Sequence, residues 1–105
     1  MYEAEKTRAQ QILSEQDIVC GIAEEAAELG HAALKYRRTM DGCVNVTPVT
    51  REEALENINE EIVDVLMYFI AWGYPIESLV ARAHNNPKWE RVAERLKNGR
   101  LGGKL

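Results

Sequence analysis

Apolar residues recur at helical spacing along most of the chain, and the alternation of β-branched residues that is typical of strands is almost missing. The pattern predicts four helical segments, over residues 2–13, 15–38, 50–72 and from 76 onward. Ser14 with Asp17, and Thr50 with Glu53, have the three-residue spacing of a capping box that begins a helix. The chain is therefore predicted to be all-α, a helical bundle of about four helices.

Glycine, asparagine and proline mark the places where the helices end. Gly73 is predicted to end the third helix, and Pro75 fits the entry of the next one. Asn85-Asn86-Pro87 should break the fourth helix before it resumes over 88–97. Residues 40–49 form a predicted loop or pocket wall, and residues 99–105 a flexible tail. Nothing resembles a linker, so residues 1–105 are predicted to form a single domain.

Two of the predicted helices carry an apolar stripe for the core. On the second helix the stripe is Ile18, Ile22, Leu29, Ala33 and Tyr36, and on the third it is Leu55, Ile58, Ile62, Val65, Leu66, Phe69 and Trp72. Acidic residues interrupt both stripes. Glu25 lies between Ile22 and Leu29, and Glu61 lies between Ile58 and Val65. These carboxylates are predicted to face the interior.

Each of these acids has an acidic partner three residues later on the same side of its helix, Glu28 after Glu25 and Asp64 after Glu61. Asp64 is the only charge between Ile62 and Trp72. Four converging carboxylates would repel one another and lose hydration, so they need a neutralising partner. An all-oxygen site suits Mg²⁺, with Mn²⁺ as a substitute. The alternative interpretation is that the four acids simply face solvent.

Composition narrows the range of functions. The chain has 105 residues and a net charge of -4, which argues against binding to a nucleic-acid polymer. No apolar run in the sequence is long enough to span a membrane, so we expect no membrane partner. The N-terminal residues do not have the pattern of a signal peptide, so we expect a cytoplasmic location. Cys20 and Cys43 occur singly and are expected to be reduced thiols. A chain this short is expected to need a second copy to complete a large cleft.

The acidic pattern Glu24-Glu25-Ala26-Ala27-Glu28, followed by Glu61-Ile62-Val63-Asp64, resembles the EExxE and ExxD signature of MazG-like all-α NTP pyrophosphatases. The resemblance covers residues 18–72. It implies a helical bundle assembled as a homodimer or homotetramer, with Mg²⁺ held by Glu25, Glu28, Glu61 and Asp64. The reaction it implies is cleavage of a nucleoside triphosphate to the monophosphate and pyrophosphate.

The same resemblance assigns two further roles. Glu24 would be an accessory catalytic acid or would orient a metal-bound water molecule. A set of Lys, Asn and Arg on the following helix would grip phosphates. The nearest residues here are Asn86, Lys88 and Arg91, of which Lys88 and Arg91 are the candidates for phosphate binding, although the spacing departs from the usual one and Pro87 interrupts that helix. Arg95 or Lys97 would be substitutes.

Several alternatives stay open at this point. Tyr68, Trp72 and Trp89 could stack on a base or belong to the core. Glu28 and His31 form the ExxH unit of di-iron proteins, but the third helix offers Asp64 where a second histidine is needed. The chain could also be a phosphoribosyl-ATP pyrophosphatase-like enzyme or a non-catalytic helical interaction module.

Overall fold

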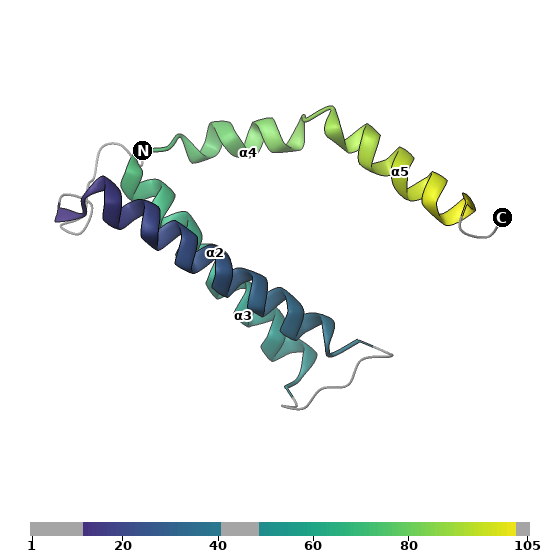
Figure 1. The fold of residues 1–105 in the computed structure, drawn as a ribbon, viewed down its shortest axis with the longest axis horizontal. Coiled ribbons are helices and arrows are strands. Elements are labelled where there is room, and N and C mark those ends of the chain that lie inside the picture. Colours follow the sequence, from purple (N-terminus) through teal and green to yellow (C-terminus); the bar gives the residue numbers. More distant parts are fainter. Residues whose placement is uncertain (1–11, 41–48, 103–105) are drawn as a thin grey trace. The chain divides into compact units, whose positions relative to one another are not determined.

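The computed structural model describes residues 12–40 and 49–102, and side chains as far as residue 99. The helices of this part are α2 (Glu15–Arg37), α3 (Arg51–Trp72), α4 (Ile76–His84) and α5 (Lys88–Gly102), and it contains no strand (Figure 1). The all-α prediction is therefore confirmed for the described residues. Most of the helix predicted over 2–13 lies outside the described residues. The loop predicted over 40–49 also lies outside them, except for its first and last residues.

Local hydrogen bonds explain where the two long helices begin. The Asp17 backbone N–H donates to Ser14 Oγ over 3.1 Å, and the Ser14 N–H donates to Asp17 Oδ2 over 3.1 Å. At the start of α3, Thr50 and Glu53 exchange the same pair of bonds over 3.1 and 3.2 Å. Both predicted capping boxes are confirmed. Each satisfies backbone donors that the first helical turn leaves without a partner.

The predicted end of α3 and the break after α4 are also confirmed. Gly73 adopts a left-handed conformation with φ 91°, which a residue without a Cβ reaches at little cost. The chain breaks between His84 and Lys88, and the Lys88 N–H donates to Asn86 Oδ1 over 2.9 Å. The helix α5 is longer than predicted, because it continues past Gly99 to Gly102.

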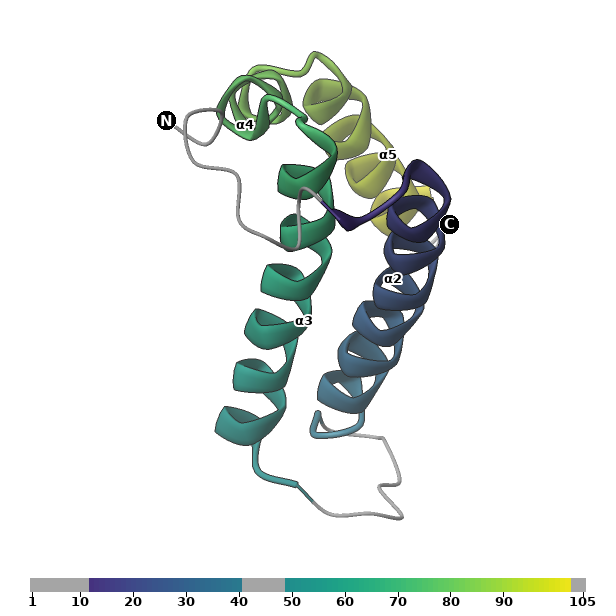
Figure 2. The ribbon, with the colours of Figure 1, turned by 90° about the vertical axis from the view of Figure 1, so that its left-hand side faces the viewer.

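The helices α2 and α3 form an antiparallel hairpin, and Figure 2 shows them side by side. The start of α2 meets the end of α3, where the Trp72 indole N–H donates to Glu15 Oε2 over 3.3 Å. The opposite end of the hairpin is closed by Arg51, whose Nε donates to the Tyr36 hydroxyl over 2.9 Å. These two contacts fix the register, and the middle of each helix therefore faces the middle of the other.

The described residues bury little apolar side-chain surface. The buried hydrophobic residues are Ile18, Ala32 and Ala54. Of the predicted stripes, Ile18 is confirmed, whereas Ala33 is exposed, and Leu55 and Ile62 are 48% and 41% exposed. The prediction was wrong at these three positions because two helices cover only the narrow line along which they touch. That line on α2 passes through Ala32 instead of Ala33.

The chain divides into two compact units, residues 1–74 and 75–105. The hairpin belongs to the first unit, and α4 and α5 belong to the second. In the second unit, the Trp89 indole N–H bridges the break between its helices by donating to the Ala83 carbonyl over 2.6 Å. The single domain predicted over 1–105 stays a prediction. Within the described residues, no helix combines the length and the apolar character required to cross a membrane.

Candidate metal centre

Three carboxylates converge where the middles of α2 and α3 face each other. Glu25 comes from α2, and Glu61 and Asp64 come from α3; one oxygen of each lies within 4.8 Å of the others. All three side chains are half-buried. Glu61 and Asp64 are three residues apart and therefore project from one side of α3. The structure thus brings together three of the four acids that the sequence predicts as metal ligands.

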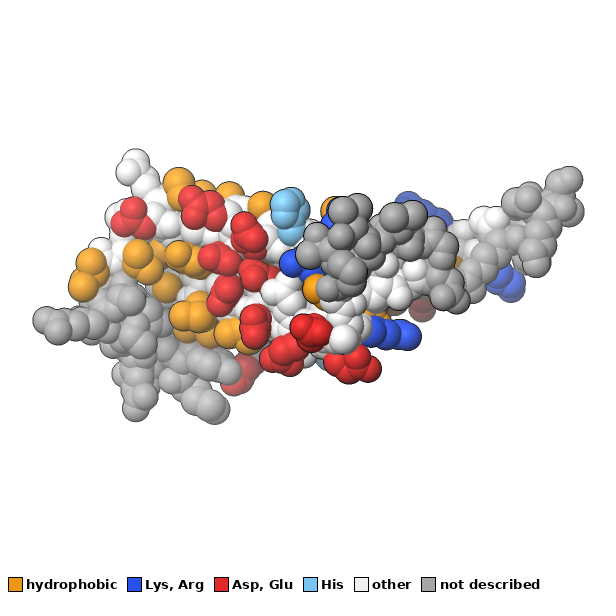
Figure 3. Space-filling model, turned by 90° about the horizontal axis from the view of Figure 1, so that it is seen from below, with side chains coloured by type: hydrophobic (Ala, Val, Ile, Leu, Met, Phe, Trp, Pro, Cys, Tyr) orange, Lys and Arg blue, Asp and Glu red, His pale blue; other side chains and the backbone are white. Residues whose placement is uncertain are grey.

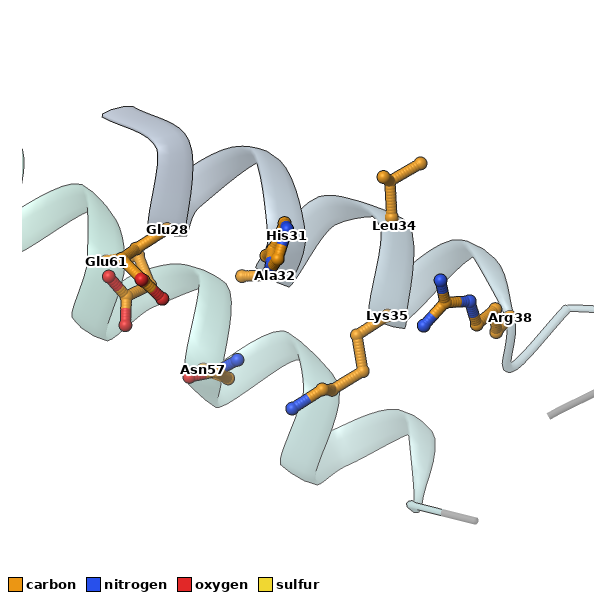
Figure 4. A pocket seen from close by; sticks show the side chains of 8 residues that line it. All are labelled: Glu28, His31, Ala32, Leu34, Lys35, Arg38, Asn57 and Glu61. Carbon is orange, nitrogen blue, oxygen red and sulfur yellow. The ribbon is translucent and has the colours of Figure 1, made fainter. Parts of the chain in front are cut away.

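Glu28 lies at the edge of this group. It follows Glu25 by three residues on α2 and is exposed, and it is not part of the tight set of three. Figure 4 shows the side chains of Glu28 and Glu61 pointing toward each other across the two helices. Glu28 is therefore placed to contribute to the same charged site, from a more open position.

Glu61 has several negative charges around its carboxyl group. Desolvation by burial raises the pKa of the Glu61 carboxyl above its ordinary value of 4.5, and the negative charges of Asp64, Glu25, Glu28 and Glu60 raise this pKa further. Its Oε2 atom is buried and has no hydrogen-bond partner among the described residues. A buried acceptor without a donor is costly, so this atom is the one that most needs a positive partner.

The donor set fits a hard divalent cation. All the ligand atoms are carboxylate oxygens, which Mg²⁺ and Mn²⁺ prefer over the nitrogen and sulfur ligands typical of zinc. Ligand oxygens around one Mg²⁺ are about 3.0 Å apart when adjacent and about 4.2 Å apart when opposite, given a bond length of about 2.1 Å. The three oxygens lie within 4.8 Å of one another, so they would have to move closer together to share one ion.

Further acids lie near the cluster, since the charges of Glu28 and Glu60 also act on the Glu61 carboxyl. Figure 3 shows acidic side chains gathered on one face, with hydrophobic side chains beside them. Within the described parts of the chain, no hydrogen bond or ion pair reaches the side chains of Glu25, Glu61 or Asp64. The cluster is thus not neutralised by a lysine or arginine of this part of the protein.

A pocket of about 290 Å³ opens beside the cluster, between α2 and α3 (Figure 4). Glu28 and Glu61 line one end of it, Lys35 and Arg38 line the other, and His31 and Asn57 lie between. The sequence interpretation missed Lys35, Arg38 and Asn57. The spacing of Lys35, seven residues after Glu28, was a usable signal, because this separation places two residues on the same side of a helix.

The remaining predicted site residues lie outside the cluster. Glu24 is exposed on α2 and is not among the converging carboxylates. Lys88 and Arg91 lie on α5 in the second unit, and their role in phosphate binding stays a prediction. Arg95 and Lys97, their substitutes, are on the same helix.

The aromatic side chains that the sequence offered for base stacking have structural contacts. The Tyr68 ring of α3 lies against Gly21 of α2. The Trp72 indole is bonded to Glu15, and the Trp89 indole is bonded to the Ala83 carbonyl. These contacts favour a structural role for Tyr68 and Trp72 over a role in stacking, whereas Trp89 is 61% exposed and the base-stacking hypothesis for it stays open.

Comparison of the chain with known protein families, with curated protein sequences and with solved structures finds no match. The resemblance to MazG-like enzymes therefore depends on the acidic signature alone.

Proposed function

We propose that the chain is a Mg²⁺-dependent nucleoside triphosphate pyrophosphohydrolase of the MazG-like kind, with Mn²⁺ able to replace Mg²⁺. The observation that carries this proposal is the convergence of Glu25, Glu61 and Asp64, of which Glu61 also has a buried, unpartnered oxygen. A cation would neutralise such a group of acids, and a cation bound next to an open pocket attracts phosphate oxygens.

Each side chain has a defined part in this proposal. Glu25, Glu61 and Asp64 hold the cation, and Glu28 completes the oxygen set from the pocket side. The cation, when bound, supplies positive charge against the phosphate oxygens and the departing pyrophosphate. Glu24 is assigned the accessory role of orienting a water molecule. The half-buried position of the three central acids limits competition from bulk water for the same charges.

The acidic cluster is tested by removing one ligand at a time. We expect Glu61→Gln and Asp64→Asn to lower pyrophosphate release from nucleoside triphosphates by about 100-fold or more, because each removes a charge that holds the cation. Glu56→Gln is the matched control, since Glu56 is an exposed acid on the same helix outside the cluster. Release would be measured with Mg²⁺ on a panel of canonical, deoxy and damaged triphosphates, and circular dichroism would check that the helices persist.

The outcomes of this panel are distinct. Unchanged turnover in Glu61→Gln would contradict the proposal. Turnover confined to phosphoribosyl-ATP would identify the related pyrophosphatase activity instead. If Mn²⁺ binds to the wild type and no triphosphate is cleaved, the chain is a non-catalytic helical module that retains the metal centre.

A further inference from the structure

The pocket beside the acidic cluster has two ends of opposite charge. Its acidic end is formed by Glu28 of α2 and Glu61 of α3, and its basic end by Lys35 and Arg38. Lys35 of α2 and Arg38, which caps the C-terminus of this helix, follow Glu28 by seven and ten residues, which corresponds to about 10 and 15 Å along the helix axis. The pocket is therefore acidic where a cation would bind and basic about two to three turns away.

The two basic side chains are directed toward the acidic end. Side chains on a helix lean toward its N-terminus, and Glu28 is N-terminal to both Lys35 and Arg38. Figure 4 agrees, since Lys35 extends across the gap toward α3 and the guanidinium of Arg38 lies on the Lys35 side of its own backbone. Among the described residues, neither side chain forms an ion pair or hydrogen bond. Their charges are available to an anion inside the pocket.

We propose that Lys35 and Arg38 bind the terminal phosphate groups of the substrate's polyphosphate chain, with the Asn57 amide placed between them and the metal centre. This inference rests on the proposed function. A polyphosphate chelated to a cation is positive near the metal and negative beyond it, which is the reverse of the charges along the pocket. These residues are different from Lys88 and Arg91, which the sequence suggested for the same role.

The size of the pocket supports a phosphate-binding role. Its volume of about 290 Å³ is just below the range of about 300–1,000 Å³ for small-molecule sites. There is room for a polyphosphate group but little for a nucleoside beside it, so the base and sugar extend beyond this pocket. Its polar lining, with two acids, two bases, an amide and a histidine, also fits a charged ligand.

If Lys35 and Arg38 had only a structural role, their substitution would change stability and not ligand affinity. Lys35 lies in the last turn of α2, where a positive charge stabilises the helix by interacting with the partial negative charge of its C-terminus. Loss of that interaction alone would lower the thermal stability of the protein and leave ligand affinity unchanged. Affinity and stability therefore need to be measured on the same variants.

The experiment is a calorimetric titration of inorganic tripolyphosphate into the full chain in the presence of saturating Mn²⁺. We expect Lys35→Gln and Arg38→Gln each to weaken tripolyphosphate binding by about tenfold or more, since each removes a charged hydrogen bond to phosphate. Lys35→Arg should restore most of the affinity by restoring the charge. Arg37→Gln is the matched control for net charge, because Arg37 is on the same helix and does not line the pocket.

A separate titration with Mn²⁺ alone distinguishes this proposal from the one on which it rests. Lys35→Gln and Arg38→Gln should bind Mn²⁺ like the wild type, whereas Glu61→Gln should not. Failure of the wild type to bind Mn²⁺ would overturn the proposed function. If Mn²⁺ binds and both glutamine variants retain wild-type affinity for tripolyphosphate, the assignment of Lys35 and Arg38 is overturned and the metal centre stands.

Discussion

At the scale of single residues, the central carboxylates of α2 and α3 could be predicted to lie on the inner faces of their helices, because the spacing that places them there is a property of each helix alone. Glu25 and Glu61 each interrupt an apolar stripe, and Asp64 follows Glu61 by three residues. The positions of the basic side chains in the pocket could not be predicted in the same way. Whether Lys35 faces the same gap as Asn57 depends on the register of the hairpin, which the contacts of Trp72 and Arg51 determine.

The raised pKa of Glu61 makes the stability of the metal-free protein depend on pH. The folded chain retains the Glu61 proton above the ordinary value of 4.5, so it binds more protons than the unfolded chain in that range. The contribution of Glu61 to the free energy of unfolding therefore decreases as the pH rises from about 4.5 to the raised pKa, and is constant above it. Glu61→Gln, which cannot ionise, should become progressively more stable relative to the wild type over this interval.

Urea unfolding of both proteins across this pH range, in the presence of a chelator, would measure the difference. A constant difference between the two proteins at every pH would contradict the assignment of the shift to Glu61. Saturating Mg²⁺ should reduce the pH dependence in the wild type, because a cation bound to the folded state stabilises it and offsets the repulsion.

At the scale of the elements, the ends of the helices were predictable because their causes are local in the chain. The capping boxes at Ser14 and Thr50, the left-handed Gly73 and the break before Lys88 each depend on residues within a few positions. How the two long helices approach each other is not local. No pattern in the sequence indicated that Gly21 would lie under the ring of Tyr68.

The close approach at Gly21 gives a matched pair of substitutions. Gly21→Ala should lower the free energy of unfolding by about 1–3 kcal/mol, because the added Cβ would overlap the Tyr68 ring and force the helices apart. Gly30→Ala lies on the same helix with open space around it and should raise the free energy of unfolding by about 0.5–1 kcal/mol. Urea unfolding of both variants provides the comparison. Equal effects of the two substitutions would show that Tyr68 does not pack over α2 in solution.

At the scale of the whole molecule, the exposed apolar side chains are the feature that the sequence did not predict. Leu55 and Ile62 belong to the stripe expected in the core, and Val63 and Met67 are 54% and 60% exposed. The reason is that periodicity identifies a side of a helix that requires burial but does not identify what covers it. The described residues of one chain leave the stripe on α3 partly uncovered.

We therefore propose that the apolar stripe of α3 takes part in a homodimer or homotetramer. Leu55→Glu and Ile62→Glu should shift the protein toward a smaller mass in light scattering measured over a range of concentrations, because each places a charge among apolar side chains of the assembly. Gln16→Glu, an equal change of charge at an exposed polar position of α2, should have no such effect. A wild type that is monomeric at all concentrations would rule out the assembly.

The two tryptophans of the chain are divided between its two units, Trp72 in the first and Trp89 in the second. Trp72 lies 5.1 Å from the Tyr74 ring between centroids and bonds to Glu15, whereas Trp89 is 61% exposed. Intrinsic fluorescence thus offers one natural reporter for each unit. In a Trp89→Phe protein, the emission follows only the opening of the hairpin, and in a Trp72→Phe protein it follows only α4 and α5, without any attached dye.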